Sequence, residues 1–157
     1  MGIERYLGTN YGSLILVEYA AIQNITTFSA SGAGKIAAAG ITFAIGTGWN
    51  SIYFSEDNMG HHQVQQTDVG GDTFTQTVVG FTPGDQEDIE SGLLNLVGSR
   101  FIIRITRPDG LMKIVGTREE PLDLKLDSNS QMTVPGAAGT LITFSGITLK
   151  RALLYTP

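Results

Sequence analysis

The chain has 157 residues, of which 41% are apolar and only 16% are charged, against roughly a quarter charged in an average soluble domain. Its net charge of −5 excludes a broad basic surface for nucleic acid, because affinity for phosphate comes chiefly from Lys and Arg. It contains no cysteine, which excludes disulfides and thiolate chemistry. The low charge is typical of a surface covered by other subunits, and equally of a β protein rich in uncharged Thr, Ser and Gln.

The length predicts a single structural domain over residues 1–157. The first residues lack a basic stretch followed by an apolar core, so no signal peptide is expected. The apolar run at 14–22 is interrupted by Glu18 and is too short to span a bilayer. We therefore expect no membrane span, and a chain that is cytoplasmic where it is made.

The first third of the chain predicts an arm followed by short β elements. Residues 1–12 lack periodicity and are expected to form an N-terminal arm. Residues 13–22 predict a buried strand, with a helix as the alternative, and residues 34–39 predict one helical turn or a flexible loop. Three further strands are expected where β-branched and aromatic residues gather, at 41–45, 50–54 and 73–81.

Residues 56–72 separate two predicted strands and contain few apolar groups. We expect them to form a polar loop or the outer part of a hairpin. A long exposed β segment leaves backbone groups unpaired, and an assembly partner can cover such an edge. Its amide side chains Gln63, Gln65 and Gln66 are therefore predicted to lie in an interface between subunits.

Residues 86–97 predict an amphipathic helix. Asp85 is placed to cap it and Asp88 follows three residues later, as in a capping box. Gly98 is a natural stop. The apolar residues recur at spacings of three to four and predict one face packed on a sheet, namely Ile89, Leu93, Leu96 and Val97.

The last third predicts a hairpin and three more strands. Residues 101–106 and 111–115 flank Arg107-Pro108-Asp109-Gly110, in which Pro presets the turn and Gly takes a positive φ. Alternating strands are expected at 121–126 and 140–149, with a loop at 127–139 that can include a short strand. The apolar end, including Leu153, Leu154 and Tyr155, predicts a final strand or docking onto a neighbour.

No pattern in the sequence predicts catalysis, a cofactor or a metal ion, so we expect a protein that is not an enzyme. Gly32-x-Gly34-x-x-Ala37 matches a relaxed dinucleotide fingerprint but lacks its βαβ context. On a strand His61 and His62 point to opposite faces, so they cannot chelate one metal ion together. Five aromatic residues are expected in the core, or else in a sugar-stacking platform, namely Trp49, Tyr53, Phe54, Phe74 and Phe81.

A series of turns, glycines and strands runs in order through the later part of the chain. It comprises Gly71 to Gln76, Val79 to Gly84, the helix at 86–97, Arg100 to Ile103, Pro108 to Gly110, Val115 to Thr117, Glu120 to Leu122, and Ile142 to Gly146. This order resembles small virion proteins of tailed bacteriophages and prophages, particularly those associated with Bacteroidetes hosts. The resemblance covers about residues 50–157 and includes no active-site residues.

The resemblance implies a structural role in the virion, with assembly in the host cytoplasm. It implies a mainly β fold, a β-sandwich or small barrel with one flanking helix at about 86–97, similar to tail-tube subunits. Such a subunit closes into homo-oligomeric rings in the tail tube or head–tail neck, contacts other virion proteins and encloses DNA as non-specific cargo. The alternatives are a capsid decoration or baseplate protein and a host-surface carbohydrate-binding module.

Overall fold

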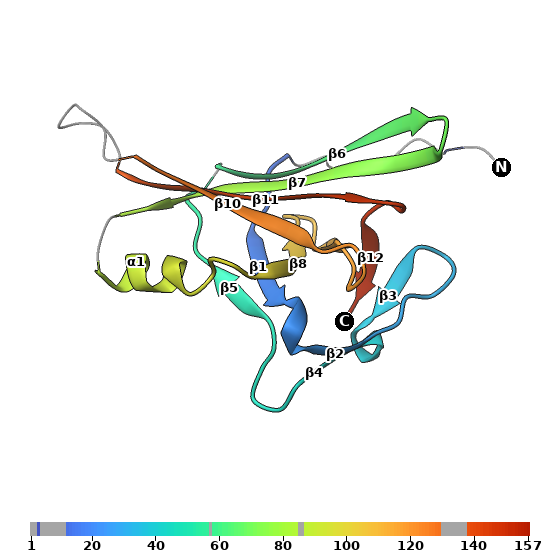
Figure 1. The fold of residues 1–157 in the computed structure, drawn as a ribbon, viewed down its shortest axis with the longest axis horizontal. Coiled ribbons are helices and arrows are strands. Elements are labelled where there is room, and N and C mark those ends of the chain that lie inside the picture. Colours follow the sequence, from blue (N-terminus) through green and yellow to red (C-terminus); the bar gives the residue numbers. More distant parts are fainter. Residues whose placement is uncertain (1–2, 4–11, 57, 85–86, 130–137) are drawn as a thin grey trace.

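A computed structural model describes residues 3, 12–56, 58–84, 87–129 and 138–157 (Figure 1). The strands are β1 Leu16–Ala21, β2 Ile25–Phe28, β3 Lys35–Ala37, β4 Ile41–Phe43, β5 Asn50–Ile52, β6 Met59–Asp68, β7 Gly71–Pro83, β8 Arg100–Thr106, β9 Met112–Val115, β10 Leu122–Asn129, β11 Gly139–Thr148 and β12 Leu153–Thr156. The helical elements are α1 Glu87–Leu94 and the 3-10 turns Ile22–Asn24 and Ala38–Gly40. The expectation of a mainly β protein with one short helix is confirmed.

Ten strands form one mixed sheet, whose main path is β3-β12-β9-β8-β10-β11-β7-β6, and β2 and β4 form a separate hairpin sheet. The large sheet branches at β8. One edge of β8 pairs with β1, which also pairs with β5. The other edge pairs with β9 from Ile103 to Thr106 and with β10 at Arg100 and Phe101. The sheet therefore has a six-stranded half, β5-β1-β8-β9-β12-β3, and a four-stranded half, β10-β11-β7-β6.

The main core lies between these two halves. Val17 and Ile103 from the six-stranded half pack in one cluster with Val78 and Phe144 from the four-stranded half. The ring of Phe101 meets that of Phe144 edge to face, with 5.6 Å between the centroids. Burial of apolar side chains from both halves holds the fold together. The alternation predicted for 121–126 is confirmed, because Leu122, Leu124 and Leu126 all contact this cluster.

A second, smaller core lies on the other face of the six-stranded half. Ile102 and Ile114 of that face pack against Ile25 and Ile41 of the hairpin sheet. Strand β8 is therefore covered on both sides, which explains its run of consecutive buried residues from Phe101 to Ile103. In Figure 1 the hairpin sheet lies below β1 and β8, and the four-stranded half lies above them.

The predicted small barrel is wrong. Strands β3 and β6 lie at opposite ends of the sheet path and do not pair with each other. Strand β10 leaves β8 after two residue pairs, and the four-stranded half then covers the core without returning to the first half. Strand β6 is paired with β7 alone among the described residues.

The predicted helix is present but shorter. Helix α1 covers Glu87–Leu94, and after it Leu96 N–H donates to Leu93 O (3.0 Å) and Val97 N–H donates to Leu94 O (3.2 Å). These i→i+3 bonds tighten the last turn. Leu93 and Leu96 are buried as predicted, whereas Val97 is 58% exposed, contrary to the prediction. Gly98 has a φ of 84° and ends the turn, and the capping residue Asp85 lies outside the described residues.

Two other segments differ from the prediction. Residues 34–39 were predicted as a helical turn or loop, but Lys35–Ala37 form strand β3, which pairs in parallel with β12. Both ends of the predicted loop at 127–139 lie in strands, because β10 continues to Asn129 and β11 begins at Gly139. The hairpin at 101–115 is confirmed. Gly110 has a φ of 84°, and its N–H donates to Arg107 O at 3.0 Å.

Candidate assembly surface

The longest open edge of the sheet is strand β6. It pairs with β7 in continuous antiparallel register from Met59 opposite Gly80 to Asp68 opposite Gly71. No strand of the described part of the chain pairs with its other edge. Most of the predicted polar segment 56–72 is therefore one strand of a long two-stranded ribbon (Figure 1). Its outer backbone groups are available to a strand from another molecule.

The three predicted interface residues of β6 differ in exposure, and strand alternation places Gln63 and Gln65 on its inner face and Gln66 on its outer face. Gln65 and Gln66 are exposed. Gln63 instead faces its own fold, and its Oε1 accepts hydrogen bonds from Gln76 Nε2 (3.0 Å) and from the Ala152 backbone N–H (2.8 Å). Gln63 therefore anchors β6 to β7 and to the start of the C-terminal strand. This leaves Gln65 and Gln66 as the exposed amides of the edge.

Gln76 is the centre of this polar cluster and is fully buried. Its Oε1 lies 2.9 Å from His61 Nε2, and its Nε2 also donates to Thr148 Oγ1 at 3.2 Å. Burial lowers the pKa of His61, against the hydrogen bond to Gln76, which raises it. A buried amide with partners on both its atoms is stabilising, whereas loss of one partner leaves a costly unsatisfied group. The cluster makes the inner face of β6 part of the folded core.

The apolar C-terminus is strand β12 of the chain's own sheet. It pairs with β9 on one side and with β3 on the other. Leu153 is buried in the smaller core. The ring of Tyr155 lies 5.2 Å from the guanidinium carbon of Arg104, which also donates to its hydroxyl at 3.2 Å. Of the three predicted interface residues of this segment, Leu154 is the exposed one.

The outer face of β6, β7 and the part of β11 from Leu141 on carries one charged side chain, Asp68 at the end of β6. The register aligns its side chains in rows, and three apolar side chains among them are exposed, Val64, Leu141 and Ile147. The other members are His62, Gln66, Thr73, Thr75, Thr77, Val79, Phe81, Thr143 and Ser145. Charged side chains resume on β10 with Asp123, Lys125 and Asp127. A face with so few charges beside an open edge is suited to contact with protein.

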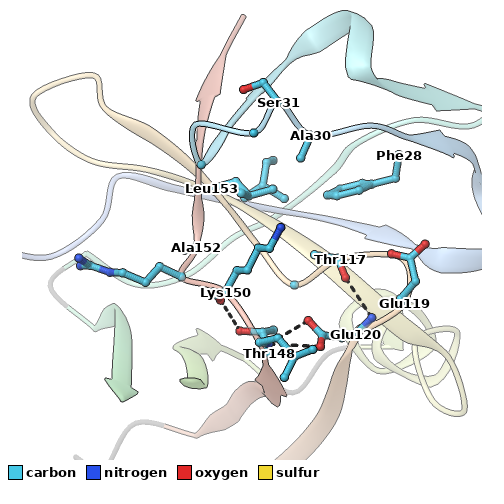
Figure 2. Close-up of a pocket in the computed structure, with 16 residues that line it drawn as sticks. Phe28, Ala30, Ser31, Thr117, Glu119, Glu120, Thr148, Lys150, Ala152 and Leu153 are labelled. Atoms are coloured by element: carbon cyan, nitrogen blue, oxygen red, sulfur yellow. Dashed lines mark hydrogen bonds between the residues drawn. The ribbon is translucent and has the colours of Figure 1, made fainter. Parts of the chain in front are cut away.

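A pocket of about 450 Å³ lies between the 28–34 segment and the turn that joins β11 to β12 (Figure 2). Phe28, Ile114 and Leu153 supply its apolar lining. The carboxylate of Glu120 accepts two hydrogen bonds from the Leu149 backbone N–H, at 3.1 and 3.2 Å, and so fixes the turn. Lys150 projects toward Phe28 in Figure 2. The pocket can hold a small group. Among the described residues that line it, the hydroxyls of Ser31, Thr117 and Thr148 bond to backbone groups and not to a carboxylate or imidazole that could act as a base.

A partly buried ion pair ties β1 to β8. Arg104 Nε and Nη2 donate to the two oxygens of Glu18 at 2.6 and 2.7 Å. The Trp49 ring lies 4.8 Å from the guanidinium carbon. The positive charge is therefore paired and covered by aromatic rings, which is the arrangement that burial of a charge requires. These contacts are structural in character.

The remaining residues marked by the sequence lie apart from one another. Gly32 and Gly34 line the pocket of Figure 2 ahead of a strand, without the helix a nucleotide site needs. Phe54 and Trp49 pack in different cores, while Tyr53 is exposed, so these three form no common platform. Within the described ranges, no group of three or more His, Cys, Asp or Glu side chains gathers to hold a metal ion.

Comparison with models of protein families, with curated protein sequences and with solved structures gives no match to this chain. No helix in the described part is long and apolar enough to cross a membrane.

Proposed function

We propose that this chain is a structural subunit of a tailed bacteriophage particle, which assembles with copies of itself into rings of the tail tube or the head–tail neck. The observation that carries the proposal is the open edge of β6. This strand is ten residues long, and within the described part of the chain it pairs on one side only, with β7. Native proteins seldom leave so long an edge open, because it offers a template to any other strand. Strand addition from a neighbouring copy covers it.

Ring closure provides such a partner for every copy. A contact between two different surfaces of the same chain repeats around an axis and, where the rotation closes, leaves no edge free. The outer face of β6, β7 and β11, whose one charged side chain is Asp68, continues this edge with Val64 and Ile147 exposed. Only 16% of the residues in the chain are charged, and surfaces that are covered by neighbouring subunits are depleted in charge.

The resemblance to small virion proteins of tailed bacteriophages supports the place in the virion. It covers about residues 50–157, which include β6 to β12 and helix α1. Two sheet halves packed on a common core with one flanking helix are compatible with a tail-tube-like subunit. The net charge of −5 suits a ring through which DNA passes without adhering, because phosphate is held mainly by Lys and Arg. The subunit would be made in the host cytoplasm and act in the virion.

The test places a charge on the open edge. Val64 lies midway along β6 and is exposed on its outer side, and edge lysines are a common device against strand addition. We expect Val64→Lys to fold normally and to sediment as a monomer under conditions in which the parent forms larger species. Ile45→Lys is the matched control, because Ile45 is fully exposed in a turn away from β6.

If Val64→Lys assembles as completely as the parent, β6 is not part of the interface. Binding of the monomeric parent to a glycan array, without assembly, would favour the carbohydrate-binding alternative.

A further inference from the structure

A second cleft, of about 520 Å³, opens between the β6–β7 ribbon and the strands β9 and β12. Gln63 of β6 lines this cleft, so the cleft lies beside the strand whose outer edge is the proposed contact. The lining is cationic and apolar, with Lys113, Lys150 and Arg151 beside Phe74 and Leu154. This concentration of positive charge is unexpected in a chain whose net charge is −5.

The three cations of this cleft form no ion pair among the described residues. Nearby carboxylates are already engaged, since Asp109 pairs with Arg107 at 3.2 Å and Glu120 accepts from the Leu149 N–H. Lys113 is partly buried. Burial lowers the pKa of its ammonium, and the positive charges of Arg151 and Arg107 lower it further, against the carboxylate of Asp109, which raises it. Like charges held together at a partly buried site are unfavourable until an anion is bound.

The register adds a fourth cation and an apolar side chain to the rim. Leu154 of β12 lies between Lys35 of β3 and Lys113 of β9 on one face of the sheet. Leu149, in the turn before β12, is 66% exposed. The surface around the cleft therefore combines positive charge with exposed leucines.

The other end of the molecule carries the complementary chemistry. Helix α1 begins with the exposed carboxylates Glu87, Asp88 and Glu90 and has no basic residue in its last turn. Beside them, Leu94 and Val97 are 72% and 58% exposed. In Figure 1, α1 lies at the left end of the long axis and β12 and β3 lie on the right. The acidic end cannot reach the cleft of its own chain.

We propose that helix α1 of one copy docks on the cationic cleft of the next copy. The inference rests on the proposed self-assembly and names the surfaces that meet. The carboxylates of Glu87 and Glu90 neutralise Lys150 and Arg151, and Leu94 and Val97 cover the exposed leucines of the rim. Because the two surfaces differ, the contact is head to tail, and its repetition builds a ring or a filament. Complementary charge selects the partner and the register.

The test uses two charge-reversed full-length proteins. In the cleft variant, Lys150→Glu/Arg151→Glu, both the cleft and helix α1 are acidic. In the helix variant, Glu87→Lys/Glu90→Lys, both the helix and the cleft are basic. Each variant alone is expected to associate at least about tenfold more weakly than the parent in sedimentation velocity at low salt. An equimolar mixture is expected to recover association, because the acidic helix of the first meets the basic cleft of the second.

The control for net charge is Arg118→Glu/Lys125→Glu, which reverses two exposed cations away from both surfaces. It is expected to associate like the parent. Association of both variants at the level of the parent would overturn the head-to-tail contact, while leaving self-assembly itself intact. Loss of association in both without recovery in the mixture would also overturn it, because the two surfaces would then not face each other. A parent that stays monomeric would contradict the proposed function as well.

Discussion

The packing of Gly80 against Phe54 is the sharpest test of the core between the two sheet halves. Gly80 lies in β7, and a Cβ built on it would approach Cγ and Cδ2 of the Phe54 ring to 2.4 Å. Phe54 is only 4% exposed and belongs to the main core, so its ring has little room to withdraw. Gly80→Ala therefore forces the ring or the strand to shift.

Overpacking of this kind costs about 1–3 kcal/mol. For a chain of this size, each kcal/mol lowers the melting temperature by roughly 2–4 °C. We expect Gly80→Ala to unfold about 2–12 °C below the parent in a circular dichroism melt. Gly60→Ala is the matched control. Gly60 lies on the neighbouring strand β6 with no atom within 4 Å of its added Cβ, so it should not lower the melting temperature.

A double-mutant cycle identifies the cause. Phe54→Ala alone should cost about 3–5 kcal/mol, because it removes a buried ring. In that background the new methyl of Gly80→Ala has space, and its cost should fall by at least about 1 kcal/mol. An equal cost of Gly80→Ala with and without the Phe54 ring would refute this packing.

Three further substitutions test the helix, the ion pair and the polar cluster. Leu93→Asp places a carboxylate in the core and should cost several kcal/mol in urea unfolding; a parent-like midpoint would show that α1 is not packed there. Arg104→Met leaves the partly buried carboxylate of Glu18 without its cation and should cost about 2–3 kcal/mol, whereas Arg100→Met, whose ion pair is exposed, should cost below about 1 kcal/mol. Because burial lowers the pKa of His61, the unfolded chain takes up this proton at higher pH than the folded protein, so stability should fall as the pH drops through its ordinary value of 6.5. His61→Gln should flatten this dependence in urea unfolding measured across that range and the exposed His62→Gln should not; equal slopes in both would contradict the burial of His61.

Local patterns predicted the elements whose partners are close in sequence. Pro108 and Gly110 marked the β8–β9 hairpin because their backbone preferences alone determine the turn. The alternation around Leu124 identified β10 for a similar reason, since one face of a strand is buried. The helix was predicted from the spacing of Leu93 and Leu96, but its last turn was not, because a change to i→i+3 bonding moves Val97 to the surface without altering the pattern.

Contacts between distant segments could not be predicted in this way. Ile36 sits in a short glycine-flanked segment and becomes part of a strand only because β12, from the other end of the chain, pairs with it. Gln63 is a polar residue in a polar segment, which predicts exposure. The register instead places it opposite the buried Gln76, whose side chain it bonds. The cationic cleft was missed for the same reason, since Lys113 and Arg151 come together only when β9 meets β12.

Negative-stain electron microscopy of the purified full chain over a range of concentrations tests the central claim most directly. The proposed function predicts closed rings of uniform diameter, or tubes of stacked rings, that grow more abundant with concentration and are absent from Val64→Lys. Rings absent from Val64→Lys would place β6 at a contact between copies, as expected for a ten-residue strand whose outer edge has no partner in the described part of the chain. A field of single particles of monomer size at every concentration, unchanged when other virion proteins are added, would contradict the claim.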